Sequence, residues 1–166
     1  MNLDCWFSCA SIRLELKNYI WHKITLMAVL SPFHLAIPVN DLEKCKSFYQ
    51  NTLNCTPGRS SNQWADFNFF GHQLVLHYDA NHQPKLHHNE VDGHAVPVPH
   101  FGVVLLWEDF NIFAIHLKES SIQFIIEPYV RFKGLKGEQR TMFFYDPSGN
   151  ALEFKSFKNL DQLFVA

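Results

Sequence analysis

The sequence predicts an α+β fold of two tandem βαβββ modules, whose paired curved mixed sheets surround a central cavity. Residues 31–79 and 100–166 follow the same order of one strand, one helix and three strands. Each segment opens on an apolar strand that begins with a histidine: His34-Leu-Ala-Ile in the first and His100-Phe-Gly-Val in the second. Repetition of one supersecondary unit indicates two modules that bury a shared core.

The composition favours a folded chain and argues against several kinds of partner. Of the 166 residues, 47% are hydrophobic, which is enough for a buried core. Sixteen acidic and fourteen basic residues give a net charge of −2, and we see no basic stripe for nucleic acid. No apolar run reaches the roughly 18 residues of a membrane span. The four cysteines form no disulfide framework, so we expect a reduced, cytoplasmic setting.

The elements of both modules follow from hydrophobic spacing. Asn40-Asp41, with Glu43 shortly after, is typical of a helix start, and apolar residues then recur at helical spacing. The first module is predicted to have strands over 33–39, 56–60, 64–70 and 73–78 and a helix over 41–54. The second is predicted to have strands over 100–107, 122–132, 141–145 and 151–157 and a helix over 108–119.

Two segments lie outside this pattern. Residues 1–30 are predicted to be an N-terminal extension, with a disordered segment as one interpretation, because they do not resemble the modules that follow. Residues 80–99 form a polar, histidine-rich connector without periodicity, which is either a linker or a lid over a site. The second module is also longer than the first, and we place its insertion in the region of residues 128–138.

The last hairpin contains a carboxylate that needs an explanation. Asp146-Pro-Ser-Gly149 supplies turn residues between two apolar strands. In the second of these strands Glu153 shares one face with Ala151 and Lys155. Burying a carboxylate alone costs several kcal/mol or more. Glu153 is therefore exposed, paired or bound to a metal ion.

Three stretches resemble one protein superfamily. FFYDPSGNALEF is similar to the last hairpin, and FHLAIPVNDLEKCKSFY and HFGVVLLWEDF to the two module openings, of the vicinal oxygen chelate superfamily. That superfamily includes glyoxalase I, extradiol dioxygenases and bleomycin-resistance proteins. The resemblance covers residues 32–157 and implies the paired βαβββ fold.

The resemblance also implies a metal site. Metal-dependent members take ligands from the first and last strands of each module, which here are His34, Val75, His100 and Glu153. Valine cannot bind a metal, so two imidazoles and one carboxylate remain, the set typical of Fe(II) oxygenases. Fe(II) is the first expectation, with zinc, nickel or manganese as alternatives. The substrate would be a small molecule that chelates the ion through two vicinal oxygens.

The absence of a fourth ligand at Val75 favours an extradiol-type dioxygenase over a glyoxalase-like isomerase or epimerase. A metal-free drug-binding protein of the bleomycin-resistance type is a third alternative, against which the three ligands argue. The resemblance also suggests a homodimer. It leaves open whether the metal site forms within one chain or across two.

Three residues are candidates for catalysis. Extradiol enzymes carry a tyrosine about ten residues before the carboxylate ligand, but Phe143 stands at that position here. Tyr145, two residues further on the same strand face, is the candidate substitute. His87 and His88 are the nearest match to an acid or base histidine upstream of the second ligand. A solvated pair of loop histidines is the alternative interpretation.

Overall fold

The computed structural model describes residues 30–85 and 87–165. The chain divides into two compact units, Met1–Phe33 and His34–Ala166. The predicted N-terminal extension therefore lies almost wholly outside the described residues. All strands and helices below belong to the second unit. None of the described helices is long and apolar enough to span a membrane.

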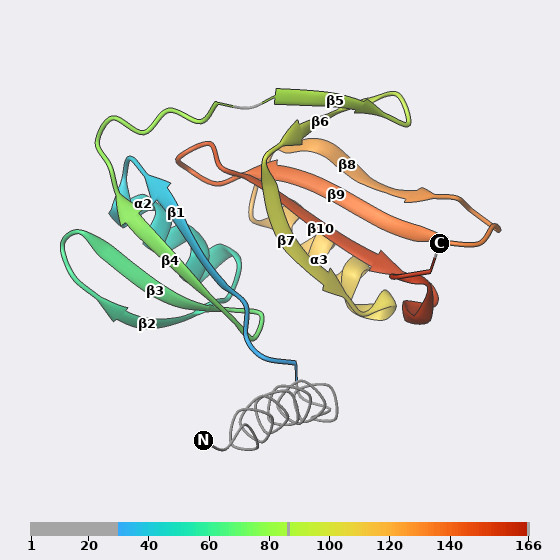
Figure 1. The fold of residues 1–166 in the computed structure, drawn as a ribbon, viewed down its shortest axis with the longest axis horizontal. Coiled ribbons are helices and arrows are strands. Elements are labelled where there is room, and N and C mark those ends of the chain that lie inside the picture. Colours follow the sequence, from blue (N-terminus) through green and yellow to red (C-terminus); the bar gives the residue numbers. More distant parts are fainter. Residues whose placement is uncertain (1–29, 86, 166) are drawn as a thin grey trace, which may run out of the picture. The chain divides into compact units, whose positions relative to one another are not determined.

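The first module forms a four-stranded sheet in the order β1-β4-β3-β2. β1 runs parallel to β4, whereas β3 runs antiparallel to both of its neighbours (Figure 1). Its strands are β1 (His34–Val39), β2 (Thr56–Ser60), β3 (Trp64–Phe69) and β4 (His72–Tyr78). The first and last strands of the module thus lie side by side.

The second module repeats this topology in the order β7-β10-β9-β8, again with its first and last strands parallel and adjacent. Its strands are β7 (His100–Leu105), β8 (Phe124–Arg131), β9 (Gln139–Tyr145) and β10 (Ala151–Phe157). The prediction of an α+β fold with a repeated βαβββ unit is confirmed.

Each module has one main helix. In the first, α2 (Leu42–Ser47) continues into a π-helical turn, Phe48–Thr52, and Asp41 caps its start by accepting a hydrogen bond from the Lys44 backbone at 3.0 Å. In the second, α3 (Trp107–Glu119) buries Phe110, Ala114 and Leu117. A short 3₁₀ helix, Leu160–Gln162, follows the last strand.

The connector between the modules contains a hairpin that we did not predict. β5 (His87–Val91) pairs with β6 (His94–Val98) as a separate two-stranded sheet. Its turn is Asp92-Gly93, and both residues have a positive φ, 52° and 75°. An Asp-Gly pair between extended segments is a hairpin signal. An ion pair between Asp92 and Arg131 ties this turn to β8.

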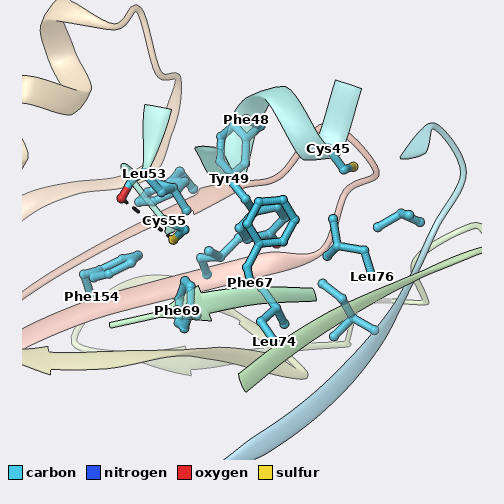
Figure 2. Packing of buried hydrophobic residues seen from close by; sticks show 14 of the residues in the cluster. Cys45, Phe48, Tyr49, Leu53, Cys55, Phe67, Phe69, Leu74, Leu76 and Phe154 are labelled. Carbon is cyan, nitrogen blue, oxygen red and sulfur yellow. Dashed lines mark hydrogen bonds between the residues drawn. The ribbon is translucent and has the colours of Figure 1, made fainter. Parts of the chain in front are cut away.

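One aromatic core joins the two modules. Tyr49, Phe67 and Phe69 from the first module are buried in the same cluster as Phe144 and Phe154 from the second (Figure 2). The ring centroids of Phe69 and Phe154 are 6.1 Å apart. Such contacts bury large apolar areas and fix how the sheets meet.

The β9–β10 turn is docked onto the first module through a buried carboxylate, Asp146. Asp146 Oδ1 accepts hydrogen bonds from the backbones of Ser148 and Asn150, both at 2.9 Å. Its Oδ2 accepts from the Tyr49 hydroxyl at 3.0 Å. Burial raises the pKa of Asp146 even though these donors oppose the shift. The turn therefore depends on Tyr49 in the first module.

We expect Tyr49→Phe to destabilise the protein by about 1–3 kcal/mol, because it removes a donor from a buried carboxylate and leaves that oxygen less satisfied. Urea denaturation measures this change. Tyr78→Phe is the matched control, because Tyr78 is 41% exposed. Equal stability of the two variants would contradict the role given to Tyr49.

Candidate metal centre

Glu153 lies in the middle of β10, between Gly102 of β7 and Phe143 of β9. It is only 8% exposed. The alternation predicted from the sequence places Glu153 on the strand face opposite the core residues Leu152 and Phe154. A carboxylate at such a position needs partners to offset its loss of hydration.

Three side chains supply those partners. The Thr141 hydroxyl donates to Oε1 at 2.7 Å, while Lys155 Nζ and His100 Nε2 lie 3.0 Å and 3.2 Å from Oε2. Burial by itself raises the pKa of Glu153, but the contacts from His100, Lys155 and Thr141 outweigh it and leave this pKa below its usual value. The carboxylate is therefore held ionised, with both oxygens fixed.

His100 has a defined orientation. Its Nδ1 lies 2.6 Å from the carbonyl oxygen of Pro97. Because a carbonyl only accepts, Nδ1 carries the hydrogen and Nε2 faces Glu153. In neutral imidazole the Nε2 lone pair would point at a carboxylate oxygen, which is repulsive. A proton or another cation must therefore lie between these two atoms.

The pKa of His100 favours a proton between these two atoms. The hydrogen bond with Glu153 raises the pKa of His100, and this outweighs the opposing effect of burial. The edge of the ring also packs on Phe143, with centroids 5.2 Å apart. These shifts favour a proton on His100 Nε2 that is donated to Glu153, and we call it the shared proton.

Gly102 allows β7 and β10 to approach at this point. A Cβ added to Gly102 would lie 1.6 Å from the carbonyl oxygen of Glu153. No side chain fits there without moving one of the two strands. The glycine in the sequence His100-Phe-Gly is therefore a requirement of the site, which sequence spacing alone did not indicate.

A second series of hydrogen bonds, in the first module, orients His34. Its Nδ1 lies 2.8 Å from Gln73 Oε1, and Gln73 Nε2 donates to Asp66 Oδ2 at 3.4 Å. Arg59 pairs with the same Asp66 oxygen at 3.2 Å. Since Gln73 donates to Asp66 through its amide nitrogen, its oxygen accepts from His34, and Nδ1 of His34 carries the hydrogen. The exposed His34 therefore presents Nε2 as its free nitrogen.

The structure brings two of the three predicted ligands together. No group of three or more His, Cys, Asp or Glu side chains converges anywhere in residues 30–85 and 87–165. The pocket that His100 lines includes Leu35, Ile37 and Pro38 of β1 but not His34. Within one chain His34 is therefore not grouped with His100 and Glu153 into a three-ligand set.

Comparisons with known proteins identify the family. A sequence model of the Glyoxalase/Bleomycin resistance protein/Dioxygenase superfamily matches residues 31–154. A glyoxalase/bleomycin resistance protein/dioxygenase from Alicyclobacillus acidocaldarius is 32% identical, with a TM-score of 0.66 over 81% of this chain and 96% of that one. The chain belongs to this superfamily. Members of the superfamily typically bind a divalent metal, and many are enzymes.

More distant structures share the fold alone. A genomically encoded fosfomycin resistance protein from Listeria monocytogenes is 18% identical, with a TM-score of 0.58 over 82% of this chain and 98% of that one. A lactoylglutathione lyase from Agrobacterium tumefaciens is 15% identical, with a TM-score of 0.54 over 77% and 94%. No protein of curated function matches the chain.

The predicted catalytic residues lie on β5 and β9. His87 and His88 are exposed on β5, where His87 Nε2 lies 2.8 Å from Asn89 Oδ1. Tyr145 is half-buried on β9, opposite Ala151. The described hydrogen bonds and ion pairs of His100 and Glu153 involve none of these three side chains. Their catalytic roles stay predictions.

Four contributors to the site were absent from the predicted set: Thr141, Lys155, Gln73 and Asp66. Thr141 and Lys155 pair across β9 and β10 on the same face as Glu153. Residues two apart in a strand lie on the same face, and this spacing was the sequence signal that could have identified them. Gln73 lies directly opposite His34 in the parallel pairing of β1 and β4. That register became visible only in the folded structure.

Two donors of the kinds that bind divalent cations converge at this site, with the Lys155 ammonium beside them. His100 and Glu153 present a nitrogen and an oxygen 3.2 Å apart, and each is held from behind by a hydrogen bond, to Pro97 and from Thr141. Orientation of ligands by such contacts is a general property of metal sites. His34, held by Gln73, has the same Nδ1–H form as His100.

The metal-free protein should show a coupled titration. The raised pKa of His100 stabilises the folded state. This stabilisation is fully present below the ordinary pKa of 6.5 and is lost as pH rises through the raised pKa. The lowered pKa of Glu153 stabilises above its ordinary 4.5 and is lost as pH falls through the lowered value. The pair therefore contributes most between these ordinary values.

We expect NMR titration of the metal-free protein to place the His100 midpoint above 6.5. Glu153→Gln should lower that midpoint, whereas Glu127→Gln, at an exposed surface carboxylate, should not. Glu153→Gln should lower the free energy of unfolding, and this destabilisation should become smaller as pH rises past the wild-type His100 midpoint. The destabilisation that remains comes from the changed contacts with Lys155 and Thr141. A wild-type midpoint at or below 6.5 would contradict the shared proton.

Proposed function

We propose that this protein is a metal-dependent enzyme whose small substrate chelates a divalent ion through two vicinal oxygens, and that it is an extradiol-type dioxygenase. The approach of His100 Nε2 to Glu153 Oε2 carries this proposal. A half-buried histidine and a buried carboxylate, each oriented by a hydrogen bond on its far side, form a structural pair only at the cost of dehydration, whereas a metal ion would use both.

The proposed ligands are His34, His100 and Glu153, and the proposed ion is Fe(II), with zinc, nickel or manganese as alternatives. Two imidazoles and one carboxylate are the donor set typical of Fe(II) oxygenases. When bound, the ion would lower the pKa of both substrate oxygens. The protein has to orient the ligands and admit the substrate.

The residues around Glu153 have distinct proposed tasks. The Thr141 hydroxyl donates a hydrogen bond to Oε1 and thereby leaves Oε2 to face the ion. Lys155, which contacts Oε2 in the metal-free protein, has to give up that contact when the ion binds. The proposed donors and acceptors of protons on the substrate are Tyr145, His87 and His88. Because His87 and His88 lie on β5, the β5–β6 hairpin has to reach the site for them to act.

The residue equivalent to Glu153 in the first module supports a three-ligand site. Val75 is buried on β4 opposite Asp66, and its side chain offers no donor atom. A site with three protein ligands suits a bidentate substrate together with O₂, and so favours the dioxygenase.

A second function, a glyoxalase-like isomerase or epimerase, is favoured by one observation. Phe143 lies directly opposite Glu153 and has no hydroxyl to donate to a catecholate. Proton transfer on a chelated enediolate does not require that hydroxyl. A metal-free drug-binding protein is the outcome if no ion binds.

We further propose that the protein acts as a homodimer in which His34 of one copy joins His100 and Glu153 of the other. Within the described part of one chain, His34 is not grouped with the other two ligands, yet its Nε2 is exposed and oriented. Closed two-fold symmetry would then form two equivalent sites. A chain that stays monomeric in light scattering at enzyme-assay concentrations would contradict this arrangement.

The test of function is turnover by protein loaded anaerobically with Fe(II). We expect about one ion per chain by elemental analysis and oxygen uptake with catechols. Glu153→Ala should lose at least about 100-fold in activity, and Thr141→Val about tenfold, because it removes only the contact that orients the ligand. Glu119→Ala, at the exposed end of α3, should match the wild type.

Isomerisation of methylglyoxal–glutathione adducts without oxygen uptake would replace the dioxygenase by the second function. No metal above the level of Glu153→Ala would contradict both enzymatic proposals.

A further inference from the structure

A pocket of about 280 Å³ lies at the seam of the two modules and borders the candidate metal centre, because His100 belongs to its lining. Its walls come from β1, the start of β7, the start of β10 and the connector. Most of the lining is apolar: Leu35, Ile37, Pro38, Pro84, Phe101 and Ala151. Concave, mainly apolar pockets with a few polar groups are typical small-molecule sites, and this one has the size for a small ligand.

Hydrogen bonds and packing hold the connector wall of the pocket in place. The carbonyl oxygen of His82 accepts from Asn40 Nδ2 at 3.2 Å, and the His82 backbone donates to Asp79 at 3.0 Å. Pro84 lies so close to the β9–β10 turn that a Cβ on Gly149 would meet its ring at 2.6 Å. The pocket is therefore formed before any ligand binds, which lowers the entropy cost of binding.

Two polar groups in the lining are already used. His100 donates from Nδ1 to Pro97 and turns Nε2 to Glu153. Asn150 donates its side-chain amide to Pro38 and Asp146, at 3.0 Å and 2.9 Å. These contacts shape the wall and leave little capacity for a ligand.

Two other polar groups in the lining have no partner among the described residues. His82 Nε2 is buried and without a hydrogen-bond partner there, so the His82 ring has to turn for a ligand in the pocket to reach it. Lys85 is exposed at the pocket, and no acidic side chain in the described part of the chain forms an ion pair with it. A buried polar atom without a partner is unusual in folded proteins and calls for an explanation. A ligand that accepts from both His82 and Lys85 would provide one.

We propose that this pocket binds a small apolar carboxylic acid. The apolar body of the acid packs on Leu35, Ile37 and Phe101, and its carboxylate accepts from His82 Nε2 and from the ammonium of Lys85. Charge-assisted hydrogen bonds of this kind are stronger than neutral ones, so an acid is preferred over an alcohol of the same shape. The carboxylate of the acid contacts His82 and Lys85 and not Glu153. His100 lines the pocket, but its two ring nitrogens contact Pro97 and Glu153.

The test uses the metal-free full chain and benzoate as the probe, followed by NMR chemical shifts and calorimetry. We expect shift changes at Leu35, Ile37 and Ala151. Lys85→Met and His82→Phe should each weaken binding about tenfold, which corresponds to one charge-assisted contact. Lys133→Met, at a lysine outside the pocket, should bind benzoate as the wild type does. Benzyl alcohol should bind at least about tenfold more weakly than benzoate.

The control for the proposed metal centre is Glu153→Gln, in which the benzoate-induced shift changes at Leu35 and Ile37 should persist, although its neighbour His100 lines the pocket. Loss of these shift changes in Glu153→Gln would assign the acid to the metal centre and overturn the proposal of a separate site. Equal affinity of Lys85→Met and wild type, or of benzoate and benzyl alcohol, would overturn the carboxylate recognition. Absence of binding by benzoate would overturn the pocket, whatever the result of the metal experiments.

Discussion

The arrangement of the second module depends on keeping one buried carboxylate ionised. Glu153 is stable in β10 only because His100, Lys155 and Thr141 surround it from both neighbouring strands and from its own. Other parts of the fold are needed to place these partners around Glu153. Gly102 lets β7 approach, Pro97 fixes the His100 ring, and the β9–β10 turn, held through Asp146 by the first module, sets the register that aligns Thr141 with the carboxylate.

The two modules share a topology but differ in the residues on equivalent positions. Val75 stands where the second module has Glu153, and Asp66 where it has Phe143. The first module therefore supplies an oriented imidazole without a carboxylate ligand, and the second supplies an imidazole and a carboxylate together. Each module holds its histidine by an acceptor at Nδ1, a side-chain amide in one case and a backbone carbonyl in the other. This division of ligands is what makes a second copy of the chain the proposed partner.

Hydrophobic spacing predicted much of this fold because each strand and helix has one buried face. The placement of His34, His100 and Glu153 on opening and closing strands followed from the same repeat. The support behind these residues could not be predicted, because Gln73 meets His34 and Pro97 meets His100 only through strand register and a local turn. The β5–β6 hairpin was missed for another reason. The polar, exposed strand β5 lacks the alternation that reveals a buried strand, and the Asp92-Gly93 turn was the clearest sign of the hairpin.

The most direct test of a site shared between two copies is a mixture of His34→Ala and Glu153→Ala chains, dissociated and reassociated together. Each variant alone should lack tightly held metal and turnover. In the mixture, half of the dimers pair one of each, and each such dimer has one complete site, so about a quarter of wild-type metal and activity should return. A mixture no more active than its separate components would contradict the shared site and place all ligands of any metal within one chain.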